Sequence, residues 1–546
     1  VDGWTAGTLL VATLVAAPVV AIAVLALAPS DGIWHHLATT VLPGYVATSL
    51  TLMVGVGLGT GFGGVATAWL VTMYRFPGRR LFEWALLLPL AVPAYVNAYV
   101  FTDFLEYAGP LQTALRDIFG WSNRQDYWFP EIRSVGGAIA MMTLVLYPYV
   151  YLLARAAFLS QPACVLEVSR TLGKGPWASF FRVALPLARP AIAVGVSLVL
   201  MEVLNDFGTV DFFAVNTFTA GIYDVWMNMN STAGAAQLAM VLLLFVVALI
   251  VIERRSRRDQ RFHQTTTRVK SLPTQPLGPV TGPLATVFCA LPIALGFVFP
   301  ATVLGRYALQ HYEVTLESDF LQHAWHSLAL SGGSAVVAVA VGLFLAYGAR
   351  LGGGGTATRI GVRVASLGYA VPGAVLAVGV IVPMAALDNS VDAFMRTTFG
   401  MPTGLLLSGT VFAVGYGYLV RFLALSYGAG ESGLARVTPA MDGAARTLGA
   451  TPFGVLRRVH MPMLRGSLVT GGILVFVDCM KELPMTVILR PFNFETLATF
   501  VHQYASDELL EECALGALAI VAVGVLPVVF LSRSLRGLRP EAEEKS

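Results

Sequence analysis

Apolar stretches of about 20 residues recur along the whole chain and leave little freedom in its fold. Each is long enough to cross the ~30 Å hydrocarbon core of a bilayer as a helix. Only 12% of the residues are charged, whereas a soluble protein carries roughly 25%. The sequence therefore predicts an all-α polytopic membrane protein with about twelve transmembrane helices. We place these spans near residues 8–28, 45–73, 81–106, 135–158, 190–210, 235–252, 283–304, 326–349, 363–386, 405–427, 467–489 and 513–532.

The basic residues indicate how the spans are oriented. With the first span directed outward, 28 of the 35 lysines and arginines fall on one side of the membrane and five on the other. By the positive-inside rule, the side with the excess is the cytoplasm. We therefore expect a multi-pass protein of the bacterial cytoplasmic (inner) membrane with both termini in the cytoplasm. The first span has no basic leader and no convincing cleavage site, so a retained helix is expected rather than a signal peptide.

One polar segment occurs twice in this otherwise apolar chain. The first copy covers residues 167–190 and the second covers residues 443–466. Their glycines, Gly173 and Gly449, lie 276 positions apart, and in both copies a proline follows thirteen residues after the glycine. An internal duplication of this kind indicates two repeats of one structural unit. An even number of spans per half makes the repeats parallel, related by an axis along the membrane normal.

Further matches and a change of composition set the expected boundaries. The tripeptide Ala-Val-Pro at 91–93 recurs at 370–372, in the third span of each half. Arg155 and Arg421 are matched at the end of the fourth span, which requires about ten extra residues before the second copy. A basic and then Thr- and Pro-rich stretch between the halves indicates a linker. The expected division is a first transmembrane domain at 1–252, a cytoplasmic linker at 253–282, a second transmembrane domain at 283–533 and a cytoplasmic tail at 534–546.

The duplicated segment has the composition of a compact projection from the membrane. Residues 166–172 and 176–185 each suit a short helix, and Gly173 separates them. In the second copy Gly449 makes the break and Pro452 opens the next helix. Arginines in both copies supply charge for a protein partner or for lipid headgroups. An ordinary connecting hairpin is the alternative, and the strict duplication argues against it.

This pattern resembles the coupling loop of ABC-importer permeases, in which an EAA motif is followed by a glycine and a spaced Leu-Pro. In that family the loop docks into a cleft on the ATP-binding subunit. The resemblance implies a type I ABC importer fold with two fused permease domains of about six helices each. The second copy departs from the pattern, because Gly443 occupies the acidic position and Asp442 precedes it. The residues implied in coupling to the ATPase are Glu167, Arg170, Gly173, Pro186, Asp442, Arg446, Gly449 and Pro462.

The chain has no GxxxxGK[ST] phosphate-binding loop, so it is not expected to be an enzyme or to hydrolyse ATP by that route. ATP and Mg²⁺ are expected on two copies of a separate ATP-binding subunit, and no cofactor is expected on this chain. A secondary transporter with parallel repeats would also have about twelve spans, but it gives no reason for the duplicated segment. A membrane enzyme or a scaffold would need a convergent His, Cys and Asp cluster, which we do not find. The basic linker is better explained as a positive-inside anchor than as a nucleic-acid site.

Four carboxylates lie in the fifth and eleventh spans at matching positions. Glu202 aligns with Asp478 and Asp206 aligns with Glu482, again 276 positions apart. Ionisable groups inside a membrane are costly and usually face a partner or a wet pathway. They could line a translocation pathway and bind a hard metal ion, which prefers carboxylate oxygens. Alternatively they pair with Lys481 or Asn205, or cap helices broken at Gly208 and Pro484, and so stabilise a gate.

The segments EVLNDFGTVDFF and KELPMTVILRPFNFETLAT resemble signature stretches of fused ferric-iron permeases. The resemblance implies that Fe³⁺ is the transported substrate and that a periplasmic ferric-binding protein delivers it. Fused permeases for thiamine, phosphonate or polyamine share the coupling loop and remain the alternatives. The expected function is therefore ATP-driven uptake of ferric iron by alternating access.

Overall fold

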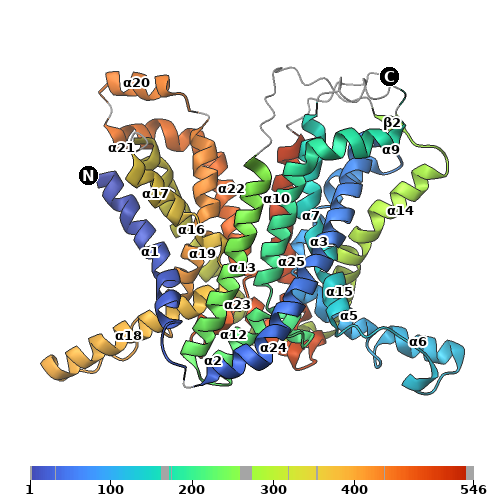
Figure 1. Cartoon of the computed structure of the whole chain (residues 1–546), viewed down its shortest axis with the longest axis horizontal. Helices are drawn as coiled ribbons and strands as arrows, with labels where there is room; N and C mark the ends of the chain where they lie inside the picture. Colours follow the sequence, from blue (N-terminus) through green and yellow to red (C-terminus); the bar gives the residue numbers. More distant parts are fainter. Residues whose placement is uncertain are drawn as a thin grey trace. The chain divides into compact units, whose positions relative to one another are not determined.

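The computed structural model describes residues 3–30, 32–161, 171, 173, 175–258, 274–317, 319–351, 355–435, 437–449 and 451–536. Over these residues the chain is almost entirely helical, with one short parallel pairing of β1 and β2 (Figure 1). The first half contains α1 (Gly3–Leu25), α2 (Ile33–His36), η1 (Leu37–Val41), α3 (Leu42–Met73), β1 (Tyr74–Arg75), α4 (Arg79–Ala85), η2 (Leu88–Ala91), α5 (Ala94–Leu105), α6 (Pro110–Phe119), η3 (Arg124–Asp126), α7 (Val135–Ser160), α9 (Pro176–Ser179), η4 (Phe180–Ala184), α10 (Leu185–Asn205), α11 (Gly208–Phe212), α12 (Phe218–Met227) and α13 (Thr232–Arg258).

The second half contains β2 (Gln275–Pro276), α14 (Thr281–Ile293), η5 (Ala294–Val298), α15 (Phe299–Glu317), α16 (Phe320–Leu351), α17 (Thr356–Ala365), η6 (Gly368–Ala370), α18 (Gly373–Phe399), α19 (Val411–Leu434), α20 (Pro439–Thr447), α21 (Pro452–Val455), η7 (Leu456–His460), α22 (Met461–Met480), α23 (Pro484–Leu489), α24 (Leu497–Ser506) and α25 (Leu510–Arg536). Here η2, η3 and η6 are 3₁₀ turns, whereas η1, η4, η5 and η7 are π-helical turns.

The predicted number of membrane spans is confirmed. Among the described residues, eleven helices are long and apolar enough to cross a membrane, and one bent pair brings the number to twelve. The bent pair is the predicted third span, which turns by 87° between Arg79–Ala91 and Ala94–Phe119. Val92 and Pro93 are extended at the turn, and Val371 and Pro372 adopt the same conformation in the second half. The Ala-Val-Pro match therefore reflects a shared backbone break, because the residue before a proline avoids the α-helical region.

The fifth and eleventh spans begin much earlier than predicted. One continuous helix runs from Pro176 to Asn205, and its counterpart runs from Pro452 to Met480. The prediction of a separate short helix after each glycine is therefore wrong. The reason is a π-helical turn, η4 or η7, which comes just before the first residues of α10 and α22. A wider turn accommodates the proline that follows, whose ring would otherwise clash with the preceding turn.

The described residues form two compact units that interleave along the sequence. Unit 1 consists of residues 1–40, 221–243 and 316–500, and unit 2 consists of residues 41–220, 244–315 and 501–546. Each unit thus combines the central helices of one half with segments of the other half. The expected division into transmembrane domains at 1–252 and 283–533 follows the sequence repeat, and it stays a prediction.

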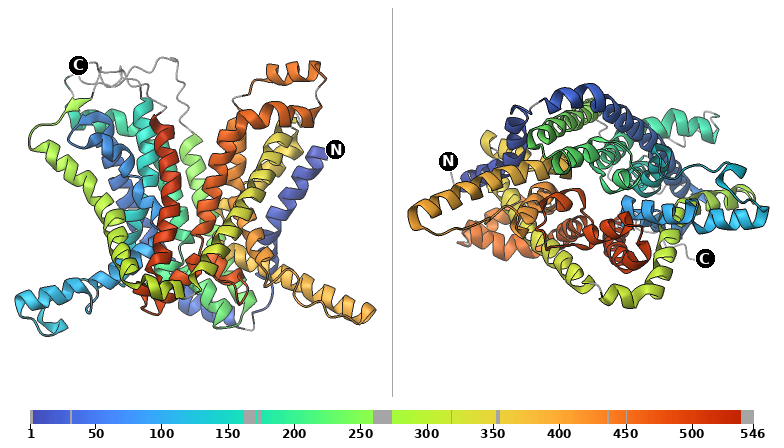
Figure 2. Two further views of the ribbon diagram at one scale, coloured as in Figure 1. Left: turned by 180° about the vertical axis from the view of Figure 1, so that it is seen from behind. Right: turned by 90° about the horizontal axis from the view of Figure 1, so that it is seen from below.

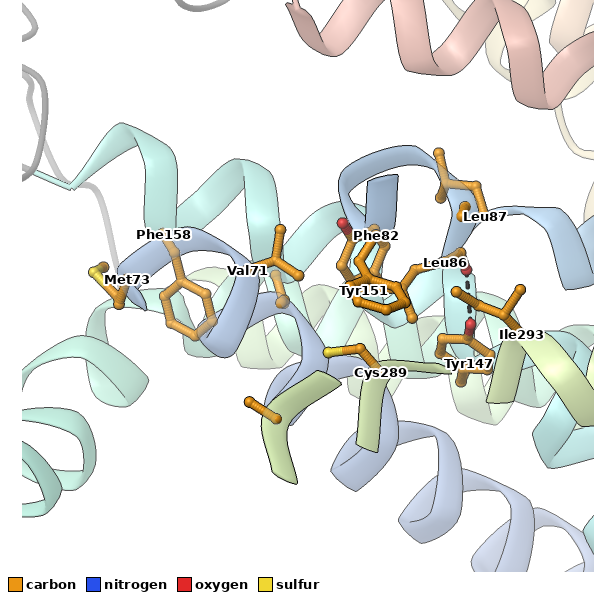
Figure 3. Packing of buried hydrophobic residues seen from close by; sticks show 14 of the residues in the cluster. Val71, Met73, Phe82, Leu86, Leu87, Tyr147, Tyr151, Phe158, Cys289 and Ile293 are labelled. Carbon is orange, nitrogen blue, oxygen red and sulfur yellow. Dashed lines mark hydrogen bonds between the residues drawn. The ribbon is translucent and has the colours of Figure 1, made fainter. Parts of the chain in front are cut away.

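The core of unit 2 lies where α3, α4, α7 and α14 meet (Figure 3). Aromatic and aliphatic side chains such as Phe82, Leu87 and Phe158 fill it. Two tyrosines place their hydroxyls on backbone carbonyls within it. Tyr147 Oη donates to the carbonyl of Leu86 at 2.8 Å, and Tyr151 Oη donates to that of Glu83 at 3.0 Å. These bonds satisfy carbonyls that the irregular chain between α4 and α5 leaves without helical partners.

Glycines let the second and fourth spans of each half pack backbone to backbone. A Cβ added at Gly64 of α3 would lie 2.8 Å from Tyr151 N on α7. In unit 1, a Cβ added at Gly342 of α16 would lie 2.8 Å from Tyr427 N on α19. Tyr151 and Tyr427 are 276 positions apart, so the fourth spans keep the same offset as the duplicated segment.

That offset corrects the match between Arg155 and Arg421. Arg155 corresponds in packing to Glu431, and no ten-residue insertion is needed. The two arginines also have different surroundings. Arg155 Nη2 pairs with Glu83 Oε2 at 3.0 Å, whereas Arg421 Nη1 donates to the carbonyl of Val371 at 3.3 Å. The two buried arginines near span ends therefore share a residue type but do not occupy equivalent positions.

Adding one methyl group at Gly64 is expected to destabilise unit 2, whereas adding it at the neighbouring Gly63 is not. At Gly64 the new Cβ would meet Val150 Cβ at 2.7 Å and backbone atoms of α7 below 3.0 Å. Overpacking of this kind costs about 1–3 kcal/mol. At Gly63 the nearest atom lies 3.9 Å away, and alanine is the better helix former by roughly 1 kcal/mol.

The measurement is the melting temperature of Gly64→Ala and Gly63→Ala in detergent. Equal melting temperatures of the two variants would contradict the close packing of α3 on α7.

Candidate functional site

The fifth and eleventh spans are both broken at their second predicted carboxylate, Asp206 or Glu482. In unit 2, α10 ends at Asn205 and α11 begins at Gly208. In unit 1, α22 ends at Met480 and α23 begins at Pro484. A helix that breaks inside a span exposes backbone N–H groups, which need acceptors in the absence of water. The carboxylates supply them.

Asp206 caps α11 in unit 2. Its Oδ1 accepts hydrogen bonds from the backbone N–H groups of Thr209 (3.0 Å) and Val210 (3.2 Å). Its Oδ2 accepts from the Thr209 hydroxyl at 3.0 Å. Thr219 Oγ1 donates to the Asp206 carbonyl at 2.6 Å, which attaches the break to α12. The carboxylate thus serves as the N-terminal cap of the short helix.

Glu482 does the same for α23 in unit 1 and is almost completely buried. Its Oε1 accepts from the N–H of Met485 at 3.2 Å. Its Oε2 accepts from the N–H of Thr486 at 3.1 Å and from the Thr486 hydroxyl at 2.8 Å. Tyr418 Oη lies 2.6 Å from that hydroxyl. Three groups of α23 therefore donate charge-assisted hydrogen bonds to one carboxylate, and Tyr418 of α19 contacts the hydroxyl of one of them.

Arg421 and Gly373 complete the surroundings of Glu482. A Cβ added at Gly373 would lie 2.6 Å from Glu482 Oε1 and 3.0 Å from Arg421 Nη1. A side chain at residue 373 would enter the space between the carboxylate and the guanidinium, which glycine leaves open. The first half has Ala94 at the position after its Val-Pro break. The sequence did not predict Arg421 as a neighbour of Glu482, because no local sequence pattern indicates that these two residues lie close together.

The other two carboxylates lie one turn earlier and are more exposed. Asp478 Oδ1 pairs with Lys481 Nζ at 3.1 Å, and both side chains are about one-quarter exposed. Glu202 lies in the last turn of α10 and is half-buried. Asp206 and Glu482 thus cap the short helices, and Asp478 forms an ion pair. These are the contacts expected in the alternative in which the carboxylates stabilise a gate.

The predicted metal and pathway roles of the four carboxylates stay predictions. Glu202 and Asp206 belong to unit 2, whereas Asp478 and Glu482 belong to unit 1. Among the residues that the structure describes, no group of three or more His, Cys, Asp or Glu side chains is placed to hold a metal ion.

A chain of three side chains in contact adjoins the break in unit 2. Tyr99 Oη lies 2.6 Å from His502 Nδ1, and His502 Nε2 lies 3.4 Å from Asp211 Oδ2. The ring of His502 also stands 5.7 Å from that of Phe207, measured between centroids. The contact joins α5 and α11 to the α24 segment, 403 positions away from Tyr99. Sequence reasoning missed this cluster because nothing local connects residues so far apart.

The structure describes part of the duplicated segment. Gly173 and Gly449 have φ angles of +73° and +80°, in the left-handed region that favours glycine. In the second copy Gly449 follows α20 and redirects the chain, whereas most of the helix expected at 166–172 before Gly173 lies outside the described residues. Glu167 and Arg170 lie outside the described residues. Arg446 lies in α20, and its side chain is outside the described part.

Pro186 and Pro462 occupy the first turn of α10 and α22, directly after the π-helical turns. The proline of the motif therefore marks the point where the duplicated segment continues into the broken span. A displacement of α9 or α21 would be carried along one continuous helix of 30 or 29 residues to the break.

Asp442 holds the second copy against the end of α16. Its Oδ2 accepts from Arg350 Nε at 2.8 Å, and its Oδ1 lies 2.7 Å from His460 Nε2. Arg350 also donates to the carbonyls of Leu434 and Val437, each at 2.8 Å. Burial raises the pKa of Asp442, and the hydrogen bonds from Arg350 and His460 outweigh it, so the pKa lies below its ordinary value. The predicted coupling role of Asp442 stays a prediction, and the structure shows an internal bracing contact.

Acid is expected to abolish the stabilisation that Asp442 provides. A carboxylate with a lowered pKa stabilises the fold above its ordinary pKa of about 3.9, and the contribution is lost as the pH falls through the lowered value. Asp442→Asn is therefore expected to cost about 1–3 kcal/mol near neutral pH, and its difference from the wild type is expected to shrink as the pH falls below the ordinary pKa. Melting curves in detergent between pH 3 and 7 measure this. Asp117→Asn, at an exposed carboxylate of α6, is the control, and a pH-independent cost of Asp442→Asn would refute the assignment.

The chain is similar in sequence to several transport permeases. Residues 55–261 match the family described as binding-protein-dependent transport system inner membrane component. The chain is 25% identical to the Fe(3+)-transport system permease protein FbpB 2 of Haemophilus influenzae over 496 residues, covering 89% of each chain. It is 29% identical to the molybdenum transport system permease protein ModB of Escherichia coli over 201 residues, or 36% of this chain and 84% of that one. It is 30% identical to the sulfate transport system permease protein CysT of Escherichia coli over 177 residues, or 32% and 60%.

Proposed function

We propose, from the match of residues 55–261 to the family of binding-protein-dependent transport inner membrane components and from the similarity to a ferric permease, that this chain carries ferric iron across the inner membrane. In this proposal the chain is the permease of an ATP-driven importer. A periplasmic ferric-binding protein delivers Fe³⁺, and two ATP-binding subunits supply the energy. Both termini and both copies of the duplicated segment face the cytoplasm.

The observation that carries the choice of iron is the extent of the similarity. The Haemophilus relative, whose name specifies Fe(3+) transport, matches 89% of this chain and so covers both halves. The relatives named for molybdenum and sulfate match about one-third of the chain. A shared fold explains a match of one half, whereas a match through both halves supports a shared arrangement of the fused permease.

The proposed mechanism follows the continuity of the helices. Closure of the two ATP-binding subunits would displace the duplicated segments at Gly173 and Gly449. Because α9 to α10 and α21 to α22 are continuous, the displacement would reach the breaks at Asp206 and Glu482. The halves would then rock, opening the pathway outward on ATP binding and inward after hydrolysis. The capped short helices α11 and α23 are the elements that we expect to move as rigid gates.

Transport in proteoliposomes tests this proposal. The chain is reconstituted with its ATP-binding subunit and binding protein, and ATP-dependent uptake of radioactive iron, molybdate and sulfate is measured. We expect iron uptake alone, dependent on ATP and on the binding protein. Uptake of molybdate or sulfate instead would overturn the assignment of iron but retain the importer. ATP-independent uptake would overturn the importer. Calorimetry of the binding protein with Fe³⁺, thiamine, phosphonate and polyamine tests the remaining alternatives.

A further inference from the structure

Each unit carries a projecting arm at the same place in its repeat. The first arm consists of α6 and residues 120–134 in unit 2, and the second consists of residues 387–412 in unit 1, including the end of α18 (Figure 2). Both helices end with the pair Phe-Gly, at 119–120 and 399–400, and both glycines have positive φ. Each arm leads directly into the fourth span, α7 or α19. Because the duplicated segment follows the other end of that span, arm and segment are separated by about 35–40 Å of helix.

The arms present apolar side chains outward. In the first arm Ile118, Phe119 and Trp128 are 74%, 60% and 86% exposed. In the second arm Phe394 and Phe399 are each 59% exposed. Exposed apolar side chains concentrated on one element indicate a surface that contacts lipid or another protein.

The apolar residues form a stripe on each helix. In the first arm they recur at i, i+4, i+7 and i+8, and in the second at i, i+3, i+4 and i+8, which places them on one helical face. The two sets are Leu111, Leu115, Ile118 and Phe119, and Val391, Phe394, Met395 and Phe399. Polar residues, among them Asp117 and Thr397, are exposed outside these stripes.

Polar groups in the loops of both arms form hydrogen bonds within the same arm. In the first arm Asp126 accepts from the N–H groups of Ser122 (2.7 Å) and Asn123 (2.9 Å), and these bonds lower its pKa. In the second arm Asp388, 1% exposed, accepts from the N–H of Ser408 at 2.7 Å and from its hydroxyl at 2.6 Å. The loops are thus held in a fixed form with their polar atoms paired.

Stacked aromatic rings add to the first arm. The rings of Phe119 and Trp121 lie 4.7 Å apart between centroids, and Trp121 and Tyr127 lie 4.7 Å apart. Tyr127 Oη donates to Gln112 Oε1 at 2.6 Å. Tryptophan and tyrosine gather at membrane–water interfaces, where an apolar ring and a polar edge are both accommodated.

We propose that both arms lie in the membrane interface, on the side away from the duplicated segments, with their apolar stripes in contact with lipid. The second arm favours contact with lipid over contact with a protein partner, because α18 is one continuous helix from a membrane span into the arm. Exposed apolar side chains continue along it from Leu387 (52% exposed) to Phe394 (59% exposed). A helix that is apolar on one side and polar on the other lies at the surface of a bilayer in the same way. The arms then fix the depth of the fourth spans, beside which the broken spans lie.

Spin labels in proteoliposomes test the proposal. Labels are placed on the stripes by Ile118→Cys and Phe399→Cys, and on the polar faces by Asp117→Cys and Thr397→Cys. The background is a chain whose four native cysteines are replaced by alanine. We expect oxygen, which concentrates in lipid, to relax the stripe labels several-fold more than a water-soluble nickel chelate does, and the reverse for the control labels.

Two results would overturn the proposal. One is equal access of the nickel chelate to all four labels. The other is water-exposed stripe labels that become protected only when the binding protein is added, which would make the arms a protein-docking surface. As a measurement independent of labelling, quenching of tryptophan fluorescence by brominated lipids is expected to fall in the Trp121→Phe, Trp128→Phe double variant. Unchanged quenching would also count against lipid contact. None of these readouts requires transport, so they stand apart from the choice of cargo.

Discussion

A chain that carries both Gly173→Val and Gly449→Val is expected to insert into the membrane but to lose most of its ATP-driven uptake. Both glycines have φ angles in the left-handed region, at +73° and +80°. No atom lies within 4 Å of a Cβ added at either position, so the substitution creates no clash. Its cost is backbone strain of roughly 1–2 kcal/mol at each site, and valine is among the residues least able to adopt this conformation. The turn between the helices should therefore rearrange while the membrane spans remain intact.

Uptake and ATP hydrolysis, measured together in proteoliposomes, check this expectation. We expect ATP hydrolysis to continue while uptake falls at least about tenfold, since even 1.4 kcal/mol is a factor of 10 in an equilibrium. Gly175→Val combined with Gly443→Ala is the matched control. Gly175 is extended, Gly443 is helical, and a Cβ at either meets nothing within 4 Å. Normal uptake by the double valine variant would refute the role of the duplicated segments in coupling.

The parts of the fold that the sequence predicts well are those with a strong local cause. A run of about 20 apolar residues has few alternatives to a membrane helix, so the spans could be placed. The break at Val92–Pro93 likewise has a local cause, in the conformational limits that proline imposes. The positive φ of Gly173 and Gly449 follows from the same kind of reasoning.

The features that could not be predicted depend on contacts between distant residues. The pair Tyr99 and His502, 403 positions apart, leaves no trace in local composition. The continuity of α9 with α10 was missed because a proline inside an apolar run is normally taken as a helix start. A π-helical turn removes that conflict at the cost of poorer hydrogen bonds. Matching Arg155 to Arg421 failed because a single residue type, without its packing neighbours, does not establish structural equivalence.

For the four carboxylates, the sequence indicated where they are but not what they contact. Positions i and i+4 on one helix predict that Asp478 and Glu482 share a face. The break of α22 at Met480 separates them instead, so that Asp478 stays on α22 while Glu482 caps α23. The two carboxylates of one span therefore have different physical roles, and this difference is measurable.

Removing the Glu482 side chain is expected to be among the most destabilising single changes in the chain. Glu482→Ala takes away the acceptor of the N–H groups of Met485 and Thr486, both in a fully buried helix terminus. It also removes the carboxylate that lies beside the buried guanidinium of Arg421. Leaving a buried hydrogen-bonding group without its partner typically costs about 1–3 kcal/mol, and more for a charged group, so the losses at Met485, Thr486 and Arg421 add up to a large effect.

Asp478→Ala is the matched control, because it removes a carboxylate from the same span four residues earlier. Its partner is Lys481, at 3.1 Å, and both side chains are partly exposed. Pairs of this kind are worth about 0–1 kcal/mol. Thermal unfolding in detergent should therefore show a large loss for Glu482→Ala and a small one for Asp478→Ala. If the two variants melted together, α23 would not depend on its cap, and the view of the broken span as a rigid gate with a buried carboxylate at its hinge would fail.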